Sequence, residues 1–196
     1  MKKILIPTDF SKNAEYALKV AAQIARKNDS EIILLHMLEL PHQASDALTT
    51  GKDIPEIMFF KNAAMRRLED LMEEDYLEGL NISEVIQFEM AFDGILKLSK
   101  KNEVDLIVMG SHGASGYKEM FIGSNAEKVV RNSDVPVLII KKEQENFEVN
   151  DFVFASDFAK EITNPFQKAV DFAKKFNAKM HLVTINTPNN FITTSA

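Results

Sequence analysis

The chain has 196 residues, 45% of them hydrophobic and 27% charged, which is typical of a globular domain and excludes collagen-like and largely disordered classes. Its lack of cysteine excludes a disulfide framework, a cysteine nucleophile and thiolate metal sites. The net charge of -6 disfavours nucleic acid as a partner. No apolar run approaches the ~20 residues that span a bilayer, and none near the start is long enough for a signal peptide. We therefore expect a cytoplasmic protein with no membrane partner.

Short apolar runs alternate along the chain with segments whose apolar residues recur at helical spacing. The predicted elements are, in chain order, a strand at 4–6, a helix over 14–25, a strand at 31–38, a loop over 39–53, a helix from 57 to about 79, a strand of alternating polarity at 82–92, a helix from 93 to about 101, a strand at 106–109, an irregular glycine-bearing segment over 110–123, a helix from 124 to about 132 and a strand at 136–140.

Five strands separated by helices require parallel crossovers and predict a doubly wound α/β domain with a five-stranded parallel sheet. The wholly apolar strands suit central positions, and the strand of alternating polarity suits an edge. The order 3-2-1-4-5 satisfies both conditions. It leaves the apolar fifth strand at the other edge, where it would be prone to aggregation if bare. We therefore expect another subunit or domain to cover that edge.

We assign this first domain to residues 1–142, and an internal repeat follows it. A polar linker spans 143–150, and residues 152–184 then align without a gap to residues 4–36, with Asp-Phe shared at the end of the first strand. Residues 151–196 therefore predict the opening βαβ of a second unit of the same kind; an accidental similarity in a terminal extension is the alternative. So short a unit cannot bury both faces of two strands, so we expect it to be truncated or completed by a partner chain.

A candidate binding site lies where the strand order reverses. Ligands of doubly wound sheets bind there, beyond the carboxyl ends of the strands, and this position brings residues 7–9 opposite residues 110–113. Gly123 and Ser124 open the next helix, whose unpaired N–H groups and dipole favour a phosphate. Glycines allow close approach of the backbone, Ser124 adds a hydroxyl donor, and Asp9 could accept a hydrogen bond from a ribose.

Each of these residues also has a purely structural interpretation. Ser124 and Glu127 have the spacing of a capping box, the glycines could serve in turns, and Asp9 could be a turn or cap residue. His112 could approach a phosphate, although a solvent-facing loop position is the simpler interpretation. The histidines have no metal-ligand spacing, so no dedicated metal site is predicted.

The residues at 2–11 and the motif G-x2-G-x9-G-[ST], formed by Gly110, Gly113, Gly123 and Ser124, resemble the universal stress protein family, specifically its ATP-binding branch. The resemblance covers residues 1–142 in full and 151–186 as the start of a tandem copy. It implies ATP in the crevice, often with Mg²⁺ or Mn²⁺ on the phosphates, and assembly into dimers or tandem pairs. We expect self-association through the fifth-strand edge or the partial repeat.

The same resemblance implies roles for individual residues. The implied binding set has Asp9 at the ribose, the backbone of Pro7 and Met37 beside adenine, Gly110 near the ribose, Gly113, Gly123, Ser124 and Asn125 at the phosphates, and Thr8 and Met109 among the remaining contacts. Asn125 departs from the small or hydroxyl residue common in the family. The partial second copy lacks the glycine segment, so we predict no nucleotide beside Asp157.

The function predicted from the sequence is that of an ATP-binding stress-response module that signals through its bound nucleotide. A slow ATPase is one alternative, but no residue is identifiable as a catalytic base, and we predict no catalytic residues. A nucleotide-free dimerisation or interaction scaffold, with purely structural glycines, is the other.

Overall fold

The computed structural model describes residues 1–38, 55–88, 90–112, 122–156 and 162–184. The chain divides into two compact units, Met1–Asn146 and Phe147–Ala196, and each is described here by itself. The loop predicted over 39–53 and most of the glycine-bearing segment lie outside the described residues.

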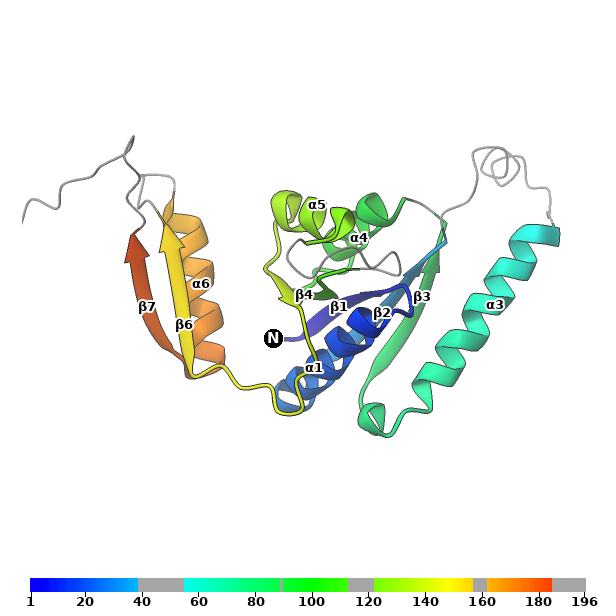
Figure 1. Cartoon of the computed structure of the whole chain (residues 1–196), viewed down its shortest axis with the longest axis horizontal. Helices are drawn as coiled ribbons and strands as arrows, with labels where there is room; N and C mark the ends of the chain where they lie inside the picture. Colours follow the sequence, from blue (N-terminus) through cyan, green and yellow to red (C-terminus); the bar gives the residue numbers. More distant parts are fainter. Residues whose placement is uncertain (39–54, 89, 113–121, 157–161, 185–196) are drawn as a thin grey trace, which may run out of the picture. The chain divides into compact units, whose positions relative to one another are not determined.

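The first unit contains a five-stranded parallel sheet with the order β3-β2-β1-β4-β5 (Figure 1), as the sequence predicted. Its strands are β1 (Lys3–Thr8), β2 (Glu31–Met37), β3 (Ile82–Gln87), β4 (Leu106–Gly110) and β5 (Val137–Ile140). The strand order reverses between β1 and β4, where a doubly wound sheet has its ligand crevice. β5 lies at an edge of this sheet, and its coverage by another subunit or domain stays a prediction.

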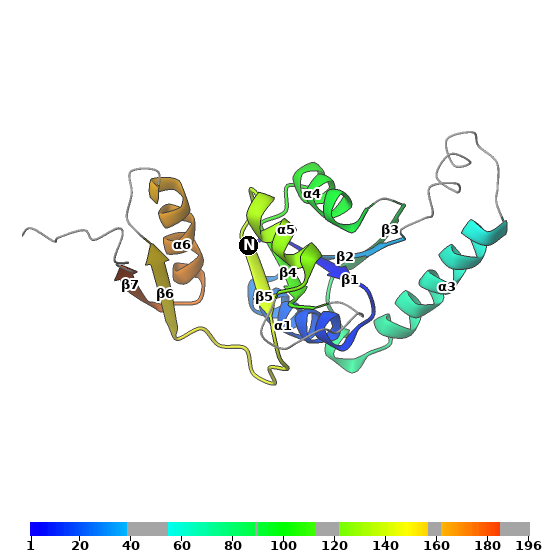
Figure 2. The same cartoon turned by 45° about the horizontal axis from the view of Figure 1, so that its top comes forward.

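Helices cover both faces of this sheet (Figure 2), with α1 on one face and α4 and α5 on the other. The described helices are α1 (Lys12–Asn28), α3 (Pro55–Met72), the short 3-10 helix η1 (Asp75–Leu77), α4 (Ala91–Lys101) and α5 (Ser124–Asn132). The alanine stripe of α1 is buried, as its helical spacing predicted. Small side chains there let the helix lie close to the strands.

The core on the α4 and α5 face positions the site. Leu5, Ile33 and Ile107 from the strands pack there against Ile95 from α4 and other buried residues of both helices. Each such aliphatic side chain stabilises the fold by roughly 1.5–3 kcal/mol when fully buried. Side chains alternate along a strand, so the residues two positions after these core residues face the same side of the sheet. They lie at the carboxyl ends of the strands.

The third strand is shorter than predicted, and this prediction was wrong at its end. β3 ends at Gln87, and α4 begins at Ala91 with Met90 at its N-cap. Phe92, which the alternation assigned to the strand, instead packs on the core from the first turn of α4. Asp93 lies within that first turn rather than at the cap, where its charge still favours the helix dipole.

The second unit is a βαβ element made of β6 (Asp151–Ser156), α6 (Thr163–Lys175) and β7 (Lys179–Thr184). Its two strands pair in parallel, as the repeat predicted. Phe152 and Phe154 pack on phenylalanines of α6, with ring centroids 5.9 and 5.4 Å apart. Within this unit Val153 and Val183 remain 60% and 40% exposed. They align with Leu5 and Leu35 of the first unit, which are buried.

Candidate functional site

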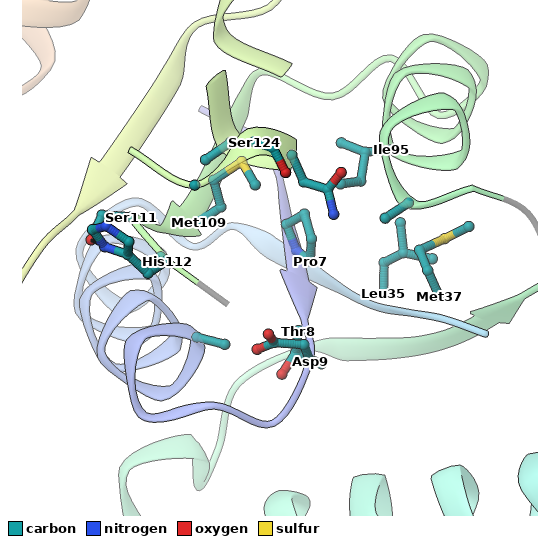
Figure 3. A pocket seen from close by; sticks show the side chains of 16 residues that line it. Pro7, Thr8, Asp9, Leu35, Met37, Ile95, Met109, Ser111, His112 and Ser124 are labelled. Atoms are coloured by element: carbon teal, nitrogen blue, oxygen red, sulfur yellow. Dashed lines mark hydrogen bonds between the residues drawn. The ribbon is translucent and has the colours of Figure 1, made fainter. Parts of the chain in front are cut away.

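A cavity of about 500 Å³ lies at the carboxyl ends of β1, β2 and β4, beneath the starts of α4 and α5 (Figure 3). Its volume lies in the usual range for small-molecule sites, roughly 300–1,000 Å³. The cavity is lined by Pro7, Thr8, Asp9, Ala14, Leu35, Met37, Ala91, Ile95, Met109, Gly110, Ser111, His112, Gly123, Ser124, Asn125 and Ala126. All the residues of the predicted binding set lie in this lining except Gly113, which is outside the described residues.

The cavity has an apolar side and a polar side. Leu35, Met37 and Ile95 lie together on one side (Figure 3). Sequence reasoning missed the α4 residues because their place depends on how that helix lies over the sheet. The one sequence signal for these residues was that α4 follows directly after a strand, so that its start lies at the edge of the sheet where the strands end. This apolar wall suits a planar aromatic ring.

The start of α5 supplies the opposite chemistry. Its N-cap is Gly123, which has no side chain to cap the helix, and Ser124 is the first helical residue. The capping-box interpretation of Ser124 is therefore wrong; the Glu127 carboxylate instead accepts a hydrogen bond from Arg131 Nε at 2.9 Å. The first-turn residues Ser124, Asn125 and Ala126 all line the cavity. Uncapped N–H groups and the positive end of the helix dipole make this a favourable place for an anion.

Asp9 has a structural role and also lines the cavity. Its Oδ1 accepts a hydrogen bond from Ser11 N at 3.0 Å, and Phe10 N donates to Thr8 Oγ1 at 3.1 Å. The turn interpretation of Asp9 is therefore correct, but the residue is exposed beside the cavity. A carboxylate held in this way is preorganised to accept a hydrogen bond from a ligand hydroxyl.

An aromatic contact stabilises the turn that carries Asp9. Phe10 has a φ of 61°, a left-handed conformation that costs a residue with a side chain roughly 1–3 kcal/mol. Its ring lies 4.5 Å from that of His36, and the Arg67 guanidinium lies 5.4 Å from its centroid. His36 Nδ1 in turn lies 2.8 Å from the carbonyl oxygen of Thr8. These contacts offset the backbone strain and fix the segment that carries Asp9.

His112 is not the solvent-facing residue that the simpler interpretation favoured. It lines the cavity, its Nδ1 lies 3.0 Å from Ser111 Oγ, and its buried Nε2 has no hydrogen-bond partner among the described residues. Ser111, only 2% exposed, also belongs to the lining. Both residues stand inside the glycine segment, which was the one sequence signal for them.

Gly110 is required for packing against α1. A Cβ at this position would lie 2.7 Å from both the carbonyl carbon and oxygen of Asn13, closer than real Cβ atoms approach backbone. We predict that Gly110→Ala lowers the free energy of unfolding by ~1–3 kcal/mol, because the start of α1 must move. Urea denaturation followed by circular dichroism measures this. An unchanged midpoint would show that this close approach carries no constraint.

Other classes of site have little support in the described residues. These residues contain no group of three or more histidine, cysteine, aspartate or glutamate side chains that could hold a metal ion. Within the same residues, no helix has both the length and the apolar character needed to cross a membrane.

Sequence comparison places this chain in a known family. Residues 1–141 match the model of the universal stress protein family. The universal stress protein MJ0577 of Methanocaldococcus jannaschii is 33% identical over 157 residues, which cover 72% of this chain and 95% of the relative. YxiE of Bacillus subtilis is 30% identical over 145 residues, covering 71% of this chain and 98% of its own length. The chain belongs to the universal stress protein family.

Solved structures agree with this assignment. The structure of MJ0577 matches with a TM-score of 0.56 at 29% identity, over 74% of this chain and 98% of that one. A universal stress protein from Archaeoglobus fulgidus DSM 4304 matches with a TM-score of 0.69 at 26% identity, over 93% of this chain and 65% of that one. This second match extends beyond the first unit. Two family structures at 21% and 20% identity, solved in complex with cAMP and dAMP, share the fold.

Proposed function

We propose that this chain binds an adenine nucleotide, chiefly ATP, in the cavity between β1 and β4. We propose that it acts as a nucleotide-dependent stress-response module. The observation that carries the proposal is the start of α5, with glycine at its N-cap, facing an apolar wall across one cavity. An adenine nucleotide has the matching chemistry, with a flat apolar base at one end and phosphate at the other. The relatives solved with cAMP and dAMP bind ligands of this class.

In the proposed pose the base lies along the apolar wall beside Met37, flanked by the backbone of Pro7 and Met37. The ribose lies near Asp9 and Gly110. The phosphates lie at Gly123, Ser124 and Asn125, and at Gly113 in the segment outside the described residues. Thr8 and Met109 complete the binding set. His112 Nε2, buried and without a partner in the part of the chain that the structure describes, adds one polar group to this lining.

We propose that Mg²⁺ or Mn²⁺ enters with the nucleotide rather than binding to the protein alone. Asp9 is the one carboxylate among the described residues of the lining. One carboxylate and nearby hydroxyl oxygens can complete the coordination of a cation that the phosphates already hold. The cation would neutralise part of the phosphate charge.

Binding rather than catalysis is the function that we assign. Among the described lining residues, Asp9 and His112 are the titratable ones, and Asp9 Oδ1 already accepts the Ser11 N–H. Hydrolysis needs a positioned water together with stabilisation of the developing charge. Slow ATP turnover is therefore not part of the proposal, and the experiment below measures it.

Nucleotide carried through purification tests the proposal. The protein is purified without added nucleotide and denatured, and the supernatant is analysed by ion-exchange chromatography with detection at the adenine absorbance band. ATP or ADP close to equimolar with the chain is the expected result, and the change in their ratio with time measures turnover. A protein that carries no nucleotide and gives no heat with Mg-ATP, AMP or cAMP in calorimetry would contradict the proposal and favour the scaffold alternative.

We propose in addition that the chain self-associates as a homodimer. The support is the edge position of the apolar strand β5 and the exposure of Val153 and Val183 in the second unit. Static light scattering should give a mass above the 22.1 kDa of one chain, and Val153→Lys or a charged residue in β5 should lower it. A constant monomer mass at every concentration would refute this.

A further inference from the structure

Gly94 occupies an unusual place in α4, next to the apolar wall of the cavity. It is buried within a helix, where glycine costs about 1 kcal/mol relative to alanine. A Cβ on Gly94 would overlap Met37 Cε and lie 2.8 Å from Met37 Sδ, and the next atom, Gln87 Oε1, is 3.4 Å away. The space of the missing methyl group is therefore filled by the Met37 thioether.

Met37 is held at its backbone, and its side chain reaches from the core to the cavity. It ends β2, where it pairs with Gln87 of β3. The next residue is held as well, because Leu38 N donates a hydrogen bond to Gln87 O at 2.8 Å. The Met37 side chain is half-buried against the core and also borders the cavity (Figure 3). A methionine side chain adapts readily, because it is unbranched and has three rotatable bonds.

We infer that Gly94 determines the specificity of the cavity for the base, by letting the Met37 thioether lie against α4 and out of the base position. This inference rests on the proposed nucleotide function. A methyl group at position 94 must displace the tip of Met37 away from α4. Leu35 and Ile95, at most 2% exposed, leave it no space within the core, so the open direction is the cavity. The displaced thioether then occupies part of the volume that the purine needs.

The direct test compares stability with binding in Gly94→Ala. The clash involves only the flexible end of a side chain, and alanine favours the helix, so we expect the variant to fold with an unchanged or higher melting temperature. Its affinity for Mg-ATP in titration calorimetry should fall by ~10-fold or more, the effect of about one methyl group in an apolar pocket. Affinity for pyrophosphate, which has no base, should be unchanged. Lys101→Ala, an exposed change on the same helix, should leave both affinities as they are.

A second background separates displacement of Met37 from any other effect of the methyl group. In a Met37→Ala protein the added methyl no longer meets the thioether, and Gln87 Oε1 at 3.4 Å is in ordinary contact, so Gly94→Ala should lower the affinity for Mg-ATP by less than 2-fold there. In the ligand-free Gly94→Ala protein, the Met37 ε-methyl resonance should shift. An equal loss of affinity in both backgrounds, or an unmoved methyl resonance, would overturn the inference. A wild-type chain that binds no nucleotide would instead overturn the proposed function, and the methyl resonance would still test the displacement.

Discussion

Gly123→Asp is expected to weaken the binding of Mg-ATP by at least ~100-fold without lowering the stability of the fold. Gly123 has φ -60° and ψ 150°, which any amino acid adopts, so a side chain there brings no backbone strain. Aspartate is a strong N-cap and would satisfy the first-turn N–H groups of α5. These are the groups that we assign to the phosphates, and hydrogen bonds to charged groups contribute roughly 1.5–3 kcal/mol each. The carboxylate therefore stabilises the helix and repels the ligand.

Gly123→Asn is the matched control, because its amide caps the helix about as well but carries no charge. It should bind Mg-ATP more weakly than wild type and clearly more tightly than Gly123→Asp. Calorimetry gives the affinities, and thermal unfolding gives the stabilities. An aspartate variant that is stable and binds with wild-type affinity would remove the start of α5 from the site.

Asp9→Asn is expected to lower the affinity for ATP by ~10-fold, the loss of a hydrogen bond to a charged acceptor. The amide oxygen of asparagine can still accept the hydrogen bond from Ser11 N, so the turn before α1 is kept. The remaining difference is the carboxylate that we assign to the ribose. Wild type should therefore bind ATP more tightly than 2′,3′-dideoxy-ATP, and Asp9→Asn should discriminate less between them.

Asp9→Ala serves as the comparison, because it removes the turn contact as well. It should lower the melting temperature, whereas Asp9→Asn should not. If the asparagine variant kept the full preference for the ribose hydroxyls, Asp9 would be a turn residue alone.

The order of the sheet was predictable because burial leaves a direct mark on a strand. Residues 4–6 of β1 and 106–109 of β4 are apolar and buried, whereas β3 mixes polar with apolar residues and is only partly buried. The end of β3 was not predictable, because an apolar residue at position 92 satisfies either a strand face or the first turn of a helix. The packing of Phe92 on the core from α4 decides between them, and that contact is non-local.

Some features of the site were predictable from the sequence and others were not. Asp9 and Gly110 were predictable because strand ends meet at one edge of a parallel sheet, whatever the side chains do. The cap of α5 was not, because the spacing of Ser124 and Glu127 fits a capping box in the sequence, and only the backbone shows that the cap is Gly123. The constraint on Gly110 comes from Asn13, almost a hundred residues away, which no local motif can indicate.

A crystal structure of the chain grown with Mg-ATP tests the central claim most directly. We predict the adenine beside Met37, the ribose hydroxyls within hydrogen-bond distance of the Asp9 carboxylate, and phosphate oxygens on the N–H groups at the start of α5. A nucleotide bound elsewhere, or an empty cavity at saturating ATP, would contradict this prediction.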